Sequence, residues 1–326
     1  MNAVNKFAKM VAIGSALPKK VLTNLELEKF LNTTDAWIID RTGIKQRHVS
    51  TAGETVVDLA VIAAVTALKN YGYTSSDIDL IVVATATPEY VFPSVACLVQ
   101  DKLNIPACFA LDVSAACSGF VYALSVANNA IKSQQAKRAL VIGSDTLTKV
   151  VNWEDKSTCV LFGDGAGAVI LEASSQPGII DIILKADGKY KDLLILSNTN
   201  ISSKYQYITM NGNKVFKLAV GLLSDIVIEL LEKNNLSIND IDWFVPHQAN
   251  IRILQATAKN LNIPMEKMII TIDKHANTSA ASIPLALDYG IKSGLIKSGQ
   301  KILFEAFGSG LTWGAALMQH AGYTNH

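Results

Sequence analysis

Apolar runs and apolar stripes alternate along this chain in a regular order. Continuous apolar runs such as LIVVATA, beginning at Leu80, and ALVIGSD, beginning at Ala139, predict strands that are covered on both faces. Helix-like patterns lie between such runs, for example from Val57 to Tyr71 and from Val215 to Asn234. Strands that alternate with helices are typical of an α/β fold.

The same order of elements occurs twice. The segments 75–106 and 238–264 both run from Asp-Ile-Asp through an apolar strand and a helix to Leu-Asn-Ile-Pro. Further along, each copy has a helix, the tripeptide Ile-Lys-Ser and another strand. We therefore expect two related halves, residues 1–174 and 175–326, packed as one compact body. Residues 174–214 have weak periodicity and many Gly, Asn and Ser, so they predict loops that join the halves.

The composition fits a large packed interior. Hydrophobic residues make up 50% of the 326 residues and charged ones 17%, against about 25% charged in an average protein. This deficit arises either from an unusually large core or from surface that another subunit covers. A chain this apolar buries enough surface to fold, which excludes intrinsic disorder.

Charge and cysteine spacing exclude further classes. With 29 Lys and Arg against 28 Asp and Glu, the net charge of +1 argues against a nucleic-acid-binding protein. No secretory signal is predicted at the N-terminus. The uncharged stretch from Val113 to Ile131 contains Ser, Gly, Tyr and Asn, so it predicts a buried helix and no membrane insertion. The four cysteines lack metal-binding spacing, and we expect reduced thiols in a cytoplasmic protein.

Cys117 is the first candidate for chemistry, because it follows the strand-like FALDVSAA and directly precedes a helical run, Ser118 to Ser133. Unpaired N–H groups at a helix N-terminus favour a thiolate, and the small neighbours Ala115, Ala116 and Gly119 leave room for an incoming group. Buried packing is the alternative. The other cysteines lie in apolar patterns and are assigned to packing: Cys97, Cys108 and Cys159.

His247 and Asn277 are the candidates in the second half. His247 lies in FVPHQAN, where a strand ends beside Gln248 and Asn250, so a polar site is expected, with a structural hydrogen bond as the alternative. Asn277, in KHANTSAAS, holds the place that Cys117 holds in the first half. A pseudo-twofold axis between the halves would bring these three side chains together. Three other histidines are expected at the surface: His48, His320 and His326.

Two glycine-rich segments have different interpretations. Gly308-Ser309-Gly310 follows a predicted strand, and its N–H groups, with that of Cys117, form a candidate oxyanion hole; a plain turn is the alternative. The segment 163–167, GDGAG, lacks the GxGxxG spacing and precedes a strand, so a dinucleotide site is rejected.

Six stretches together resemble one enzyme family. They are TTDAWIIDRTGIKQRH, SAACSGFVYAL, FGDGAGA, FVPHQANIRI, HANTSAAS and FGSGLTWGA, and the likeness runs from Val11 almost to the C-terminus. The chain resembles β-ketoacyl-acyl-carrier-protein synthase III, a bacterial condensing enzyme. This resemblance implies the thiolase fold, an α/β architecture of two duplicated halves in five αβαβα layers, usually as a homodimer.

The resemblance also implies an acyltransferase that starts type II fatty-acid synthesis. Cys117 would take an acyl group, typically acetyl, from acyl-CoA. Malonyl-acyl-carrier protein would then lose CO2, and its carbanion would attack the acyl-cysteine to give 3-ketoacyl-carrier protein. His247 and Asn277 would donate hydrogen bonds to the malonyl thioester oxygen. No cofactor and no metal are implied, since the CoA thioester is a substrate.

Further contacts follow from the resemblance residue by residue. Trp37 and Arg41 match positions that contact the CoA adenine and phosphates, and Lys156 stands where the family often has an adenine-stacking arginine. Phe92 matches a residue that closes the acyl pocket of the neighbouring subunit. The pantetheine channel or its mouth is implied for Gly212, Phe216, Asn250 and Arg252. A basic patch for the acidic carrier protein is implied for Lys217, Arg252 and Lys259.

Departures from the family pattern leave the acyl primer open. Besides Lys156, they are Ser309 in place of the middle glycine of the usual turn and Ala276 in place of a glycine. One alternative is a synthase III-like paralogue of secondary metabolism with another starter or acceptor. Another is a cysteine-dependent acyl-CoA thioesterase, which would need a general base for water, and the sequence offers no spare acidic residue near the three candidate residues. Because all three are present, a non-enzymatic scaffold is disfavoured.

Overall fold

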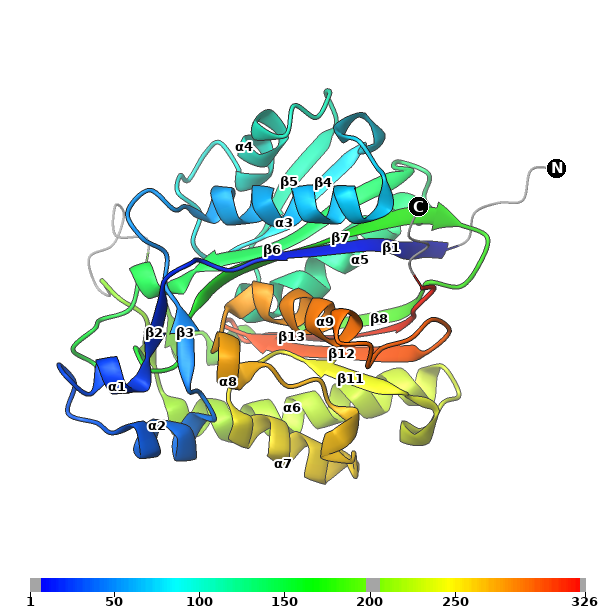
Figure 1. Ribbon diagram of the computed structural model, residues 1–326. Coiled ribbons are helices and arrows are strands. Elements are labelled where there is room, and N and C mark those ends of the chain that lie inside the picture. Colours follow the sequence, from blue (N-terminus) through cyan, green and yellow to red (C-terminus); the bar gives the residue numbers. More distant parts are fainter. Residues whose placement is uncertain (1–6, 198–205, 323–326) are drawn as a thin grey trace.

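The computed structural model describes residues 7–197 and 206–322 and arranges them in five layers (Figure 1). Helices α3 (Val56–Tyr71) and α4 (Val95–Lys102) cover the outer face of one sheet. Helices α5 (Gly119–Lys132) and α9 (Ser282–Lys292) lie between the sheets, and α6 (Gly212–Lys233) and α7 (Ile251–Leu261) cover the outer face of the other sheet. No helix in these two described ranges is long and apolar enough to cross a membrane.

The first sheet orders its strands β1-β7-β6-β4-β5. Strand β4 pairs in parallel with β5 and β6, whereas β7 pairs antiparallel with β1 and β6. Every residue of β4 is buried, as its continuous apolar run predicts. The bounds are β1 (Phe7–Ala16), β4 (Leu80–Ala84), β5 (Phe109–Val113), β6 (Arg138–Thr146) and β7 (Asp164–Ser174).

The second sheet orders its strands β11-β12-β13-β8. Strand β11 pairs in parallel with β12, and the other pairs are antiparallel. The bounds are β8 (Ile179–Ala186), β11 (Trp243–Pro246), β12 (Lys301–Gly308) and β13 (Thr312–Gln319). The prediction of loops over 174–214 is wrong for β8. This strand forms the edge of the sheet, and its Asp181 and Lys185, which pair with charged residues of α6, interrupt the apolar pattern.

The repeated Asp-Ile-Asp tripeptide has the same structural role in both halves. Asp77 and Asp240 each close a 3-10 turn by accepting the N–H and hydroxyl of the residue three positions earlier. The Asp79 carboxylate accepts a hydrogen bond of 2.9 Å from the N–H of Arg138 at the start of β6. In the same way, the Asp242 carboxylate accepts one of 2.8 Å from the N–H of Lys301 at the start of β12. The repeat therefore reflects matching contacts between a turn and the neighbouring strand.

The proposed halves, 1–174 and 175–326, meet in the middle layer. Side chains of α5 and α9 share one apolar cluster with inward-facing residues of both sheets. Smaller elements flank this body: β2 (Val21–Thr23), β3 (Gln46–His48), α1 (Asn24–Leu27), α2 (Asp35–Thr42), β9 (Leu194–Ile195), β10 (Thr209–Met210) and α8 (Ile272–His275). Helix α2 lies against α7, so the projecting N-terminal elements form a wall beside the second half (Figure 1).

Candidate active site

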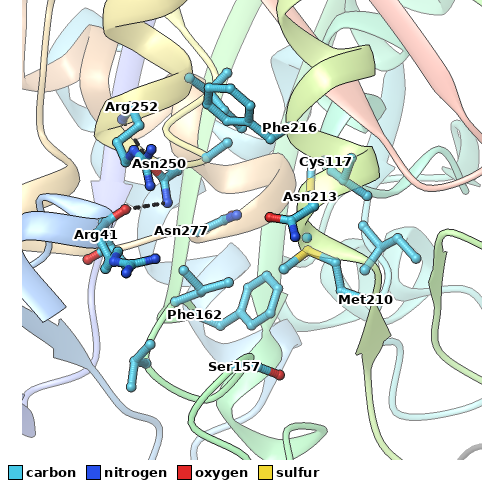
Figure 2. Close-up of a pocket in the computed structure, with 18 of the residues that line it drawn as sticks. Arg41, Cys117, Ser157, Phe162, Met210, Asn213, Phe216, Asn250, Arg252 and Asn277 are labelled. Atoms are coloured by element: carbon cyan, nitrogen blue, oxygen red, sulfur yellow. Dashed lines mark hydrogen bonds between the residues drawn. The ribbon is translucent and has the colours of Figure 1, made fainter. Parts of the chain in front are cut away.

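A cavity of about 360 Å³ is lined by Cys117, His247 and Asn277 together. Figure 2 shows Cys117 and Asn277 in its lining. Cys117 lies in a 3-10 turn directly before α5, His247 directly follows β11, and Asn277 lies in the link between α8 and α9. All three side chains are buried, with exposed fractions of 8%, 3% and 7%. The structure thus brings together the residues that the repeat placed at one site.

The predicted equivalence of Asn277 and Cys117 is wrong at the helix starts. Each half has a 3-10 turn whose first residue has positive φ, Ala116 at 45° and Ser279 at 52°, and this turn matches Cys117 with Ala280. The α-helices that follow these turns have 14 and 11 residues. Positions matched by counting back from the Ile-Lys-Ser tripeptide at the end of each helix are therefore offset from the matching turns by nearly one helical turn. Asn277 reaches the site from an extended segment, where its N–H donates to the Leu161 carbonyl at 3.0 Å.

Burial dominates the pKa of the Cys117 thiol. It raises the pKa to about 12, while a hydrogen bond with the Ser279 hydroxyl lowers it and the nearby Asp145 carboxylate raises it. The helix N-terminus was expected to favour a thiolate, whereas the pKa is raised because desolvation is the largest contribution. The Cys117 side chain is a protonated thiol at neutral pH.

His247 is a neutral imidazole held by a hydroxyl group. Burial lowers its pKa to about 3. Its Nδ1 lies 2.6 Å from the Ser282 Oγ, and the N–H of Gln248 donates to the same oxygen at 3.3 Å. The ring stands edge-on to Phe307, with 6.0 Å between ring centroids. A neutral imidazole of this kind donates one hydrogen bond without carrying a charge.

Asn277 presents its carboxamide to the same cavity (Figure 2). Its Oδ1 accepts the N–H of Ser279 at 2.9 Å, which orients the amide so that its NH2 group remains a donor. Gln248, which the sequence analysis counted as part of the polar site, instead has a structural role. It donates to the carbonyls of Pro246 and Ile269 and accepts two backbone N–H bonds, so its side chain is fully occupied away from the cavity.

Two buried carboxyl groups lie beside the site, and the expectation of no acidic residue there is wrong. Asp145, at the end of β6, accepts N–H bonds from Ala86 at 2.7 Å and Ala280 at 3.1 Å, besides two threonine hydroxyls. Glu305, whose backbone carbonyl accepts the His247 N–H at 2.8 Å, is buried in β12, and burial raises its pKa to about 8. In the sequence, each of these carboxyl groups could have been recognised as a charged residue in an apolar strand pattern. Neither lines a cavity at Cys117, so neither is placed to activate water there.

Trp37, Arg41 and Lys156 lie close together in the lining of the 360 Å³ cavity. The guanidinium carbon of Arg41 lies 5.6 Å from the Trp37 ring centroid, and the Lys156 Nζ lies 5.4 Å from it. Lys156 also donates to the carbonyl of Asn32 at 2.8 Å, which ties its loop to the segment before α2. Two cations over one aromatic ring make this part of the lining suited to an anionic, ring-bearing ligand.

The remaining predicted channel residues line the same cavity: Gly212, Phe216, Asn250 and Arg252. Asn250 caps α7 by accepting the N–H of Arg252 at 2.9 Å and donates to the Arg41 carbonyl at 3.1 Å (Figure 2). The Arg252 guanidinium lies 5.8 Å from the Phe216 ring centroid. Lys217 on α6 and Lys259 on α7 are exposed, outside the cavity lining.

A second cavity of about 240 Å³ also reaches Cys117. Its lining combines apolar side chains, Leu147, Phe162, Ile208 and the β9 residues, with three serines, Ser114, Ser279 and Ser309. Phe92 lies outside both cavities, and its side chain is 84% exposed. It borders a separate surface hollow with Tyr90 and Val91, which are also exposed. Within one chain, therefore, Phe92 does not close the space beside Cys117.

Several minor expectations are corrected by the structure. His320 is buried, not at the surface, and His48 is half-buried with its Nδ1 2.7 Å from the Pro18 carbonyl; His326 lies outside the described residues. Among the cysteines assigned to packing, Cys97 is exposed. In the two described ranges, no three His, Cys, Asp or Glu side chains cluster as a metal site requires.

Comparisons with known proteins decide the family. A family model described as 3-oxoacyl-[acyl-carrier-protein] synthase III matches residues 111–188, and the model of its C-terminal part matches residues 231–320. A β-ketoacyl-[acyl-carrier-protein] synthase III of Thioalkalivibrio sulfidiphilus is 53% identical over 320 residues, which cover 96% of this chain and 99% of the relative. The chain belongs to the β-ketoacyl-acyl-carrier-protein synthase III family.

Solved structures of synthase III support the same assignment. The enzyme from Aquifex aeolicus has a TM-score of 0.92 and 47% identity, and the match covers 96% of this chain and 99% of that one. The enzyme from Pseudomonas aeruginosa has a TM-score of 0.93 and 39% identity, covering 98% and 99%. The predicted thiolase fold, with five αβαβα layers, is confirmed.

Two departures from the usual synthase III sequence have visible consequences. Ala276 adopts φ 58° and ψ −162°, a conformation in which a Cβ is strained and glycine is not. Ser309 uses its hydroxyl to donate a hydrogen bond to the Leu194 carbonyl in β9. Gly308, by contrast, cannot be replaced by a residue with a side chain unless the backbone moves, because a Cβ at this position would lie 2.8 Å from the Cys117 nitrogen.

Proposed function

We propose that this synthase III condenses an acyl-CoA primer, acetyl-CoA in the first instance, with malonyl-acyl-carrier protein. The products are 3-ketoacyl-carrier protein, CoA and CO2, so the enzyme initiates type II fatty-acid synthesis. One observation carries the proposal: a single cavity holds a thiol, Cys117, with two neutral hydrogen-bond donors, His247 and Asn277. A nucleophile and preorganised donors are what acyl transfer followed by decarboxylation requires.

In the first half-reaction, the Cys117 sulfur attacks the thioester carbonyl of acyl-CoA. A sulfur–carbon bond forms to Cys117, the bond to the CoA sulfur breaks, and the Cys117 proton ends on the CoA thiol. The transient oxyanion is held by backbone N–H groups of Cys117 and Ser309. The close approach of Gly308 to the Cys117 nitrogen supports this placement, because it brings the two backbone segments together.

In the second half-reaction, the malonyl thioester oxygen accepts hydrogen bonds from His247 and Asn277. Cleavage of the carbon–carboxylate bond releases CO2, and the charge that develops on that oxygen is stabilised by the two donors. The carbanion attacks the acyl-Cys117 carbonyl, the sulfur leaves, and Cys117 regains a proton from solvent. His247 suits this role because a pKa of about 3 keeps it an uncharged donor. Neither half-reaction needs a cofactor or a metal.

Substrate contacts are proposed for the rest of the cavity. Trp37, Arg41 and Lys156 bind the adenine and phosphates of CoA, and Gly212, Phe216, Asn250 and Arg252 line the path of the pantetheine arm. Lys217, Arg252 and Lys259 bind the acidic carrier protein. Phe92, exposed on one chain, closes the acyl pocket of a second copy in a homodimer. We propose that the enzyme works in the cytoplasm.

The test follows the mass of the intact protein through both half-reactions. The protein is incubated with acyl-CoAs of increasing length, and malonyl-carrier protein is then added. We expect an acyl adduct on Cys117 that is lost on condensation and is absent from Cys117→Ala. His247→Ala should abolish decarboxylation while largely sparing acylation. No adduct with any acyl-CoA would contradict the mechanism, and an adduct released only as free acid would favour a thioesterase.

A further inference from the structure

Ser309 joins the turn after β12 to the strand β9. Its Oγ donates a hydrogen bond to the Leu194 carbonyl, across 115 residues of sequence. The same turn also holds the chain before β9, since the backbones of Leu311 and Asp187 exchange two hydrogen bonds of 2.9 and 3.1 Å. Of these contacts, the Ser309 hydroxyl is the one that a side-chain substitution removes.

Leu194 occupies a decisive place between the two cavities at Cys117. It lines both of them, and with Ile195 and Leu196 it supplies much of the apolar wall of the 240 Å³ cavity. Strand β9 is only two residues long and pairs with β10 in a separate two-stranded sheet, outside the two main sheets. A wall with so few backbone bonds depends strongly on each further contact.

We infer that Ser309 is a specificity-determining residue: its hydrogen bond to Leu194 fixes β9 and thereby limits the length of acyl group accepted beside Cys117. The inference rests on the proposed function, because it takes the 240 Å³ cavity as the acyl pocket. A short acyl group on Cys117 fits without displacing the wall. A longer chain pushes against Leu194 and the next two residues, so it binds only when the Ser309–Leu194 bond breaks.

The size of the effect follows from one neutral hydrogen bond. Such a bond contributes a factor of about 5 to an equilibrium between two arrangements. Removal of the Ser309 hydroxyl should therefore favour long acyl groups over short ones by about fivefold. Ser309 both bonds Leu194 and lines the 240 Å³ cavity, so the ratio between chain lengths is measured in two variants. Equal ratios in Ser309→Ala and Ser309→Gly report the lost hydrogen bond, whereas a ratio that rises only in Ser309→Gly reports added space and would overturn the inference.

The experiment measures rates of Cys117 acylation by intact mass, with acetyl-, butyryl-, hexanoyl- and octanoyl-CoA at subsaturating concentration. Ser309→Ala and Ser309→Gly remove the hydroxyl, and Ser309→Thr retains it. Ser298→Ala is the matched control, because the Ser298 hydroxyl also donates to a backbone carbonyl, that of Ala321 at 2.9 Å, away from both cavities. Thermal unfolding of each variant is recorded alongside.

We expect the octanoyl-to-acetyl ratio to rise about fivefold in Ser309→Ala and Ser309→Gly and to return toward the wild-type value in Ser309→Thr. The ratio should not change in Ser298→Ala. An unchanged ratio, or an equal loss at every chain length, in the variants without the hydroxyl would overturn the inference. Failure of the proposed function looks different, since the wild-type protein would then form no adduct with any acyl-CoA.

Discussion

The Nδ1 of His247 lies 2.6 Å from the hydroxyl oxygen of Ser282, the first residue of α9. The same oxygen accepts the N–H of Gln248 at 3.3 Å, and the decarboxylation proposed above requires the Ser282 proton to be donated to Nδ1. A ring whose Nδ1 accepts a hydrogen bond carries its own proton on Nε2. In that arrangement Ser282 holds His247 in the tautomer that donates to an oxygen in the cavity, and the next prediction tests this role.

Loss of the Ser282 hydroxyl should separate the two half-reactions. We expect Ser282→Ala to slow decarboxylation of malonyl-carrier protein by about tenfold, because His247 loses the contact that fixes its ring and tautomer. Acylation of Cys117 should change much less, and Ser282→Thr should restore decarboxylation. The measurements are CO2 release and adduct formation by intact mass. Ser293→Ala, which removes an exposed hydroxyl at the other end of α9, is the control. Equal slowing of both half-reactions would argue against this role.

The pH dependence of decarboxylation should lack a histidine transition. Burial lowers the pKa of His247 to about 3, so the imidazole stays neutral from pH 8 down through pH 5. An ordinary histidine, with a pKa near 6.5, would gain a proton in that range. We expect the rate of CO2 release to have no inflection between pH 5.5 and 7 in about 0.15 M salt, a range that lies below the pKa of about 8 of the buried Glu305. A fall in rate with a midpoint near pH 6.5, absent from a His247→Asn variant, would show that His247 titrates in the site.

Cys117 should react slowly with iodoacetamide, at a rate that keeps increasing with pH. Burial raises its pKa to about 12, and alkylation requires the thiolate, so the rate should grow about tenfold per pH unit from pH 7 to 9.5. Peptide mass spectrometry follows the modification of Cys117 and of the exposed Cys97, which reports that the reagent is active. A plateau of the Cys117 rate below pH 8 would instead indicate a stabilised thiolate.

Replacement of Ala276 by glycine should stabilise the protein. The backbone at φ 58° and ψ −162° costs a residue with a Cβ about 1–3 kcal/mol, whereas glycine adopts it freely. The greater flexibility of glycine in the unfolded chain offsets roughly 0.5–1 kcal/mol of that gain. We expect Ala276→Gly to raise the free energy of unfolding by about 1 kcal/mol, measured by urea denaturation.

The same substitution inside a helix is the control for that experiment, because it should change the stability in the opposite direction. Ala258 is buried inside α7, where glycine weakens the helix. Ala258→Gly should therefore lower the free energy of unfolding by about 1 kcal/mol. If both variants were destabilised alike, the conformation of Ala276 would not be strained.

Local features of the sequence determined most of the architecture. The apolar runs became buried strands, because a strand covered on both faces must be apolar along its length. The repeated Asp-Ile-Asp motif predicted the duplication, since each copy makes the same turn-to-strand contacts. The edge strand β8 was missed, because Asp181 and Lys185 interrupt its apolar pattern. Both side chains pair with charged residues of α6.

The sequence by itself also indicated which residues could meet, because Cys117 and His247 each come after a strand and the repeat pointed to Asn277 in the second half. Only the tertiary structure decided their chemical state. The thiol is protonated and the imidazole neutral because burial removes water from both, and burial is a property of the packed molecule. The contacts of Ser282 with His247 and of Ser309 with Leu194 join residues far apart in the chain. No local pattern records such pairs, since they form only when the layers pack.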